Sequence, residues 1–174
     1  MITRLIVPKQ AVGANLVYFD LFNASGSCLT LEVLSVLPVV SGAVAVVGTL
    51  AVDLFLTRTT AVGTGGTAAT QGGTSLTAAM FSPHDWEGAL DASVTARLTP
   101  AGGATAGNVL AFRSVFTEET SSAAYAPQFD MVRALDPALP GLLVREGTGI
   151  RVVQGAVASV GNIGFDVIFK AHAR

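Results

Sequence analysis

LLVREGTGIRVVQGAVASVGNIGFDVIFKAHA, residues 142–173, contains two strand patterns joined by a turn of small residues. In the final pattern, large apolar residues alternate with small or polar ones: Ile163, Phe165, Val167 and Phe169 against Gly164, Asp166, Ile168 and Lys170. Successive side chains of a strand point to opposite faces, so the first set forms an apolar wall. A second sheet has to cover this wall, and we expect the rest of the chain to supply its strands.

Strand patterns recur upstream, separated by turn signals. They cover residues 15–23, 28–37, 44–57, 92–99 and 108–118, with a further short strand expected at 129–133. We expect the first two to form a hairpin through the turn Ala24–Ser27, and Pro38 to stop or bend the second. Seven to nine strands without a long helix predict an all-β protein, a two-sheet antiparallel sandwich. Long connections favour a jelly roll over an immunoglobulin-like sandwich, and the strand order does not follow from the pattern.

The length of 174 residues indicates a single domain spanning residues 1–174. Residues 1–13 are expected to form a short N-terminal arm, with an edge strand at Arg4–Val7 as the alternative. Residues 59–75, TTAVGTGGTAATQGGTS, predict a long Gly/Thr loop. No GK[ST] follows these glycines, so a phosphate-binding loop is not predicted.

Charged residues make up only 13% of the chain, against roughly 25% in typical soluble domains. We interpret this as a surface covered by neighbouring chains; a bias toward Ala and Val is the alternative. The basic residues are scattered and the net charge is −2, which disfavours nucleic-acid binding. No apolar run has the length of a membrane span, so no membrane partner is expected.

Cys28 is the single cysteine of the chain, and its place at the start of an apolar strand predicts a buried, inert thiol.

The sequence contains few residues that could carry out catalysis. The chain has two histidines, His84 and His172, and no nucleophile motif surrounds either. Asp85 and Glu87 lie near His84, but neighbouring residues point in different directions, so a metal site is not predicted. The acidic pair at 118–119 is interpreted as a solvated strand end, and Trp86 as a packing anchor. The sequence therefore predicts a non-enzyme without catalytic, cofactor-binding or metal-binding residues.

Two stretches carry a resemblance to a known family. LFNASGSCLTLEVLSV, residues 21–36, and GLLVREGTGIRVVQGAVASVGNIGFDVIFKAHA, residues 141–173, resemble the small β-sandwich structural proteins encoded by tailed bacteriophages. The resemblance implies a virion protein, most of all a capsid decoration (cement) protein that stabilises the head. It also implies a homo-oligomer, typically a trimer, bound to the major capsid protein on the capsid exterior after assembly in the host cytoplasm. The N-terminal arm or the 59–75 loop would reach the shell.

Three alternatives stay open. A phage fibre or tail module that binds a receptor or carbohydrate would expose aromatic residues in loops, for which Trp86, Tyr125 and Phe129 are candidates. A self-standing jelly-roll capsid protein would usually carry a basic arm, whereas residues 1–13 contain only Arg4 and Lys9. A monomeric carbohydrate-binding module would be distinguished by its mass in solution.

Overall fold

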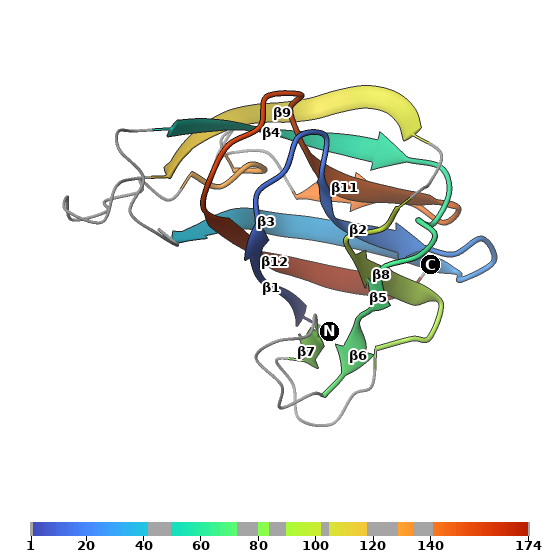
Figure 1. Cartoon of the computed structure of the whole chain (residues 1–174). Helices are drawn as coiled ribbons and strands as arrows, with labels where there is room; N and C mark the ends of the chain where they lie inside the picture. Colours follow the sequence, from blue (N-terminus) through green and yellow to red (C-terminus); the bar gives the residue numbers. More distant parts are fainter. Residues whose placement is uncertain are drawn as a thin grey trace.

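The computed structural model describes residues 2–41, 50–72, 80–83, 90–101, 105–117, 129–133 and 141–173, and every regular element in them is a β-strand (Figure 1). The all-β class is therefore confirmed. In chain order the strands are β1 (Ile2–Ala11), β2 (Val17–Asn23), β3 (Leu29–Ser41), β4 (Leu50–Thr59), β5 (Thr67–Ala68), β6 (Thr70–Gln71), β7 (Met80–Pro83), β8 (Val94–Leu98), β9 (Thr105–Thr117), β10 (Leu142–Val144), β11 (Thr148–Gln154) and β12 (Asn162–Ala173).

The strands form two six-stranded sheets that pack face to face. Sheet A has the order β10-β3-β12-β1-β7-β6 and sheet B the order β5-β8-β2-β11-β4-β9. Eight of these strands form the two quartets β10-β3-β12-β1 and β2-β11-β4-β9, which is the strand order of a jelly roll. The predicted sandwich and its jelly-roll topology are confirmed. Strands β5 to β8 are an insertion between β4 and β9 that extends both sheets.

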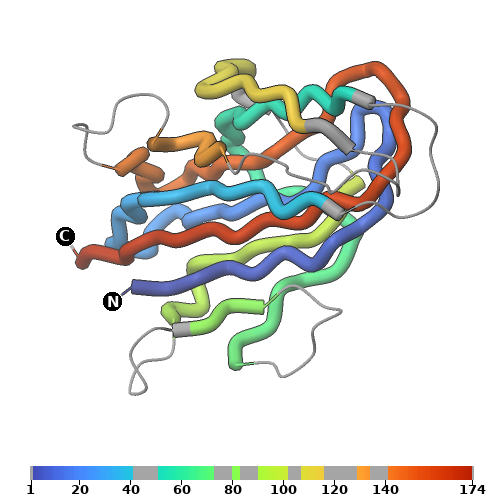
Figure 2. Tube along the Cα trace, turned by 90° about the vertical axis from the view of Figure 1, so that its left-hand side faces the viewer, coloured from blue at the N-terminus to red at the C-terminus, as the bar shows by residue number. Residues whose placement is uncertain are grey.

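The apolar wall read from the C-terminal strand is the centre of the core. Ile163, Phe165, Val167 and Phe169 are all at most 1% exposed. The ring of Phe165 packs against Tyr18 and Phe19 of sheet B, with centroid separations of 5.2 and 5.4 Å. Strand β12 lies between β3 and β1, and the three run side by side across sheet A (Figure 2). The residues that close the sandwich are therefore those that the alternation placed on one face.

Strand β3 continues through Pro38, contrary to the expected stop. Its register against β12 shifts between the pairs Ser35↔Ile168 and Val33↔Phe169, so Leu34 is an extra residue in a β-bulge. The nitrogen and oxygen of Val36 point away from β12, because they bond to Asp130 and Met131. Pro38, two residues further on, faces the same way, so its missing N–H removes no bond to β12.

The expected N-terminal arm is wrong. Residues 2–11 form β1, which pairs with β12 along most of its length and with β7 on its other side. Leu5 and Val7 are buried in the core. The alternation of these apolar residues, and not their position at the chain terminus, decides their structure, because a half-apolar strand gains by burying one face.

The expected hairpin of residues 15–23 with 28–37 is also wrong. Strand β2 belongs to sheet B and β3 to sheet A, so the turn between them is an arch that crosses the sandwich. Gly26 and Cys28 adopt positive φ angles of 79° and 56° in this arch. The Asn23 side chain donates a 2.9 Å hydrogen bond to the Leu29 carbonyl and holds the arch closed. Turn residues between two strands are the same in an arch and in a hairpin, so local sequence does not separate them.

Two smaller expectations change as well. Cys28 is exposed, because it lies in the arch before β3 begins. Residues 131–133 form a turn and not a strand, held by Asp130, whose carboxylate accepts bonds from the backbone N–H groups of Val36, Val132 and Arg133. The hydroxyl of Ser35 also donates to this carboxylate.

The expected Gly/Thr loop at 59–75 is attached to the sandwich over much of its length. Thr59 ends β4, and residues 67–68 and 70–71 form β5 and β6. The backbone N–H of Gly63 donates to the Asp20 carboxylate, and Arg97 donates a 3.0 Å bond to the Gly65 carbonyl. Residues 73–75 lie outside the described part. The predicted irregular segment thus includes two edge strands, each two residues long.

Candidate functional site

The described residues contain no group of three His, Cys, Asp or Glu side chains that could hold a metal ion. Among the residues weighed from the sequence, His172 is on β12 and pairs with Glu32 of β3 at 3.0 Å. Phe129 is half-exposed at 48%. The others lie outside the described residues: His84, Asp85, Trp86, Glu87, Glu118, Glu119 and Tyr125.

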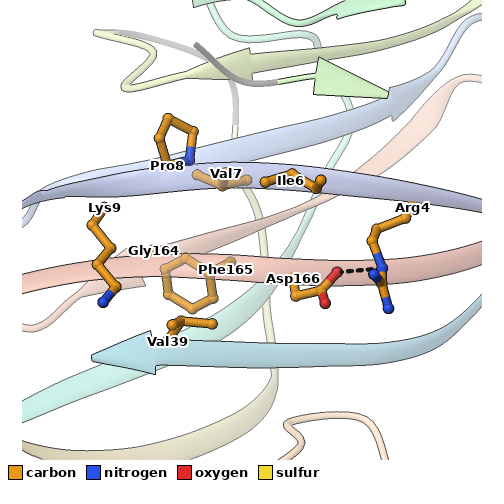
Figure 3. Close-up of a pocket in the computed structure, with 9 residues that line it drawn as sticks. All are labelled: Arg4, Ile6, Val7, Pro8, Lys9, Val39, Gly164, Phe165 and Asp166. Carbon is orange, nitrogen blue, oxygen red and sulfur yellow. Dashed lines mark ion pairs between the residues drawn. The ribbon is translucent and has the colours of Figure 1, made fainter. Parts of the chain in front are cut away.

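A groove on the outer face of sheet A is a hollow in the described surface. It has a volume of about 540 Å³ and crosses β3, β12 and β1 (Figure 3). It is lined by Arg4, Ile6, Val7, Pro8, Lys9, Val39, Gly164, Phe165 and Asp166. Branched aliphatic groups thus line it together with charged groups from β1 and β12. We call this feature the sheet A groove.

A β-bulge and a glycine form the groove. The pairing of β1 with β12 runs from Val7↔Phe165 to Gln10↔Ile163, so Pro8 and Lys9 together oppose Gly164. A Cβ atom added to Gly164 would lie 2.6 Å from the carbonyl oxygen of Val7 and 3.0 Å from the nitrogen of Lys9. The bulged backbone therefore occupies the space that a side chain would need, and the surface above remains hollow.

Gly164→Ala should lower the free energy of unfolding by about 1–3 kcal/mol, because backbone atoms of β1 must move to admit the methyl group. Urea unfolding monitored by circular dichroism measures this loss. Gly72→Ala is a control for the addition of a methyl group, since nothing lies within 4 Å of that Cβ position, although its positive φ of 64° adds a strain of its own. An unchanged stability in Gly164→Ala would contradict the close approach of β1.

The groove has one compensated and one uncompensated cation. The Nε atom of Arg4 lies 3.1 Å from an Asp166 carboxylate oxygen, and Figure 3 shows this pair at one end. Burial raises the pKa of Asp166, and the nearby Arg4 opposes this rise. Lys9 lies at the other end, and among the described residues no ion pair includes it. The groove therefore carries a net positive charge of one at neutral pH.

A second surface feature is an apolar row across the outer face of sheet B. The register places Val17 of β2 beside Val153 of β11, Val153 beside Phe55 of β4, and Phe55 beside Phe112 of β9. The rings of Phe55 and Phe112 stack with centroids 4.9 Å apart, and Phe112 is 46% exposed. We call these four residues the sheet B row.

Neither feature was identified from the sequence. The groove needs the register of β1 against β12, and the row needs four strands that are distant in the chain. The signals that were present are Pro8-Lys9, a dipeptide compatible with a bulge, and Gly164, the glycine in an otherwise large-residue strand. Without the strand order, the sequence does not show that Pro8-Lys9 and Gly164 lie opposite each other.

No helix in the part of the chain described here has the length and apolarity to cross a membrane. Comparison with known proteins found no matching family model, no matching curated protein and no matching solved structure. The class that the fold defines is a β-sandwich with jelly-roll topology.

Proposed function

We propose that the protein is a structural component of a virion, a decoration (cement) protein that binds its own copies and the major capsid protein on the outside of a tailed-phage head. The sheet B row is the observation that carries this proposal. It exposes aliphatic and aromatic side chains on a sheet face, where an interface between copies would bury them. The phage assignment itself rests on the resemblance of residues 21–36 and 141–173 to phage β-sandwich proteins.

The edge next to the row favours contact through the face and not through strand pairing. Arg113 of β9 lies opposite the buried Leu54, so its side chain leaves the strand on the inner side. Its guanidinium turns back and donates a 2.8 Å bond to the Phe112 carbonyl. An inward-pointing charge on an edge strand disfavours pairing with another edge. The exposed side chains of Phe112 and Val109 then remain as apolar contacts at this edge.

The structure changes which segment can reach the shell. Because residues 2–11 are a strand inside sheet A, the N-terminal segment is not available to reach the shell. The exposed residues of β5 and β6 remain as the part of the 59–75 loop that a shell could contact. Binding to assembled shells and not to dissociated subunits would stabilise the particle by mass action.

We expect a trimer by size-exclusion chromatography with light scattering, and a shift to monomer in Phe112→Asp, because a carboxylate would be desolvated in the interface. Leu143→Asp is the matched control, since Leu143 is similarly exposed, at 43%, but lies on β10 of sheet A. The wild-type protein should also sediment with shells assembled from the major capsid protein of the same genome. A wild-type protein that is monomeric and does not bind these shells would overturn the proposal.

A fibre or tail module that binds a receptor or carbohydrate is the alternative function. The half-exposed rings of Phe112 and Phe129 favour it, because aromatic faces stack on sugars. Glycan-array binding that disappears in Phe129→Ala, together with no binding to shells, would support this alternative over decoration.

A further inference from the structure

We propose that the sheet A groove binds an extended peptide segment of a partner protein, with a branched aliphatic side chain over Gly164 and a carboxylate beside Lys9. This inference concerns a different surface from the sheet B row and does not depend on the proposed function. It follows from the shape of the groove, from its apolar lining and from its charge.

The shape fits an extended segment. Arg4 and Lys9 flank the groove on the same strand (Figure 3), and a strand rises about 3.3 Å per residue, so they are separated by about 16 Å along β1. This length corresponds to about five extended residues. The volume of about 540 Å³ accommodates side chains of such a segment and exceeds the needs of a single ion.

The lining specifies an aliphatic contact. Ile6 and Val39 are partly exposed and lie on the outer face on either side of β12. Gly164 lies between their strands and carries no side chain, so the hollow above the bulged backbone is open to a side chain from a ligand. Burying a branched aliphatic group against these residues removes apolar surface of both partners from water.

The charges specify where an acidic group lies. Asp166 already neutralises Arg4 at one end, whereas Lys9 carries the uncompensated charge at the other. A carboxylate therefore gains most beside Lys9. A ligand with its acidic group at the Arg4 end would instead approach the Asp166 carboxylate and be repelled.

The test is a titration of ¹⁵N-labelled protein, followed by amide chemical shifts, with the blocked peptide acetyl-VTLTE-amide, whose Val, Leu and Glu side chains share one face when it is extended. Its neutral counterpart acetyl-VTLTQ-amide and the free acid 4-methylpentanoate are the comparison probes. We expect saturable shifts at Lys9, Gly164 and Asp166, with the acidic peptide about threefold tighter than the neutral one at low salt, as for an exposed ion pair. Added salt should reduce this preference.

Lys9→Gln should abolish the preference for the acidic peptide while leaving the fold intact, because Lys9 is exposed. Lys170→Gln is the matched control: it removes a positive charge from the face of β12 that carries Gly164 and Asp166, and it should keep the preference for the acidic peptide. Equal affinity for both peptides, an unchanged preference in Lys9→Gln, or absence of saturable shifts at Gly164 would each overturn the proposal. Binding of 4-methylpentanoate as tight as that of the peptide would also overturn it, in favour of a small-acid site.

Discussion

Phe165→Ala is expected to lower the free energy of unfolding by about 3–5 kcal/mol. The ring is 1% exposed and contacts Tyr18 and Phe19 of the opposite sheet, so truncation leaves a cavity in the middle of the sandwich. Sheet A and sheet B are both held by many hydrogen bonds between strands, so neither can move far enough to fill the cavity. Equilibrium unfolding in urea, followed by tryptophan fluorescence and circular dichroism, measures the loss.

Phe112→Ala is the matched control, because it removes the same side chain from a 46% exposed position on β9. It should cost less than about 1.5 kcal/mol, mostly the stacking with Phe55. Similar losses in the two variants would mean that β12 has been assigned the wrong inner face. The comparison should be made at a protein concentration at which both variants have the same oligomeric state.

Asp20→Ala should lower the free energy of unfolding by about 2–5 kcal/mol, because it leaves two buried backbone donors without an acceptor. The side chain is 1% exposed. One carboxylate oxygen accepts the N–H of Arg97 at 2.9 Å, and the other accepts the N–H of Gly63. The substitution therefore detaches the segment after β4 from sheet B. Faster amide hydrogen exchange at Gly63 should accompany the loss of stability.

Asp20→Asn keeps one acceptor oxygen but presents an NH₂ group to the other donor, so its loss should be smaller than that of Asp20→Ala. Asp91→Ala is the surface control: Asp91 is exposed and, among the described residues, its carboxylate bonds only to Ser93, so a loss within about 1 kcal/mol is expected. A loss for Asp20→Ala no larger than this control would contradict the anchoring role.

Asp20 should also give a pH signature. Burial raises its pKa above the ordinary value of 3.8, although the N–H groups of Gly63 and Arg97 and the charges of Arg97 and Arg151 oppose this rise. The folded chain then holds the proton more tightly than the unfolded chain, so this group makes the free energy of unfolding fall as pH rises from about 4. The difference in the free energy of unfolding between wild type and Asp20→Asn should therefore become smaller as the pH rises from about 4 to the raised pKa of Asp20. At higher pH this difference should stay constant. A gap that widens with pH would show that the pKa is lowered.

Strand alternation predicted the core well. The inner face of β12, the buried positions Leu31 and Val33 of β3, and the buried positions Val52, Leu54 and Leu56 of β4 are those that the sequence pattern places together. Beyond the β3 bulge the pattern changes face, so the buried Val36 was not predicted. These assignments succeed because a strand has a period of two. The same alternation fails in β9, where Phe112 is 46% exposed and Ala111 and Val115 of the other face are buried. Residues 44–49, which the pattern joins to β4, lie outside the described part.

Strand partners were predicted less well. The arch after β2 was mistaken for a hairpin, and β1 was mistaken for an arm, because the same local residues fit both structures. A bulge such as the one at Pro8-Lys9 arises only when two particular strands are paired. The candidate groove and the sheet B row depend on those pairings, so neither could be located from one sequence.

The sequence by itself determined the all-β class, the inward faces of β12, of β4 and of β3 before its bulge, and a surface poor in charge, because each depends on residue type and on a short local period. The tertiary structure alone decided which strands are neighbours, where the bulges lie and which outer residues meet. The physical reason is that hydrogen bonds between strands join backbone groups common to all residues, so register is selected by packing across the whole sandwich and not by the residues of one strand.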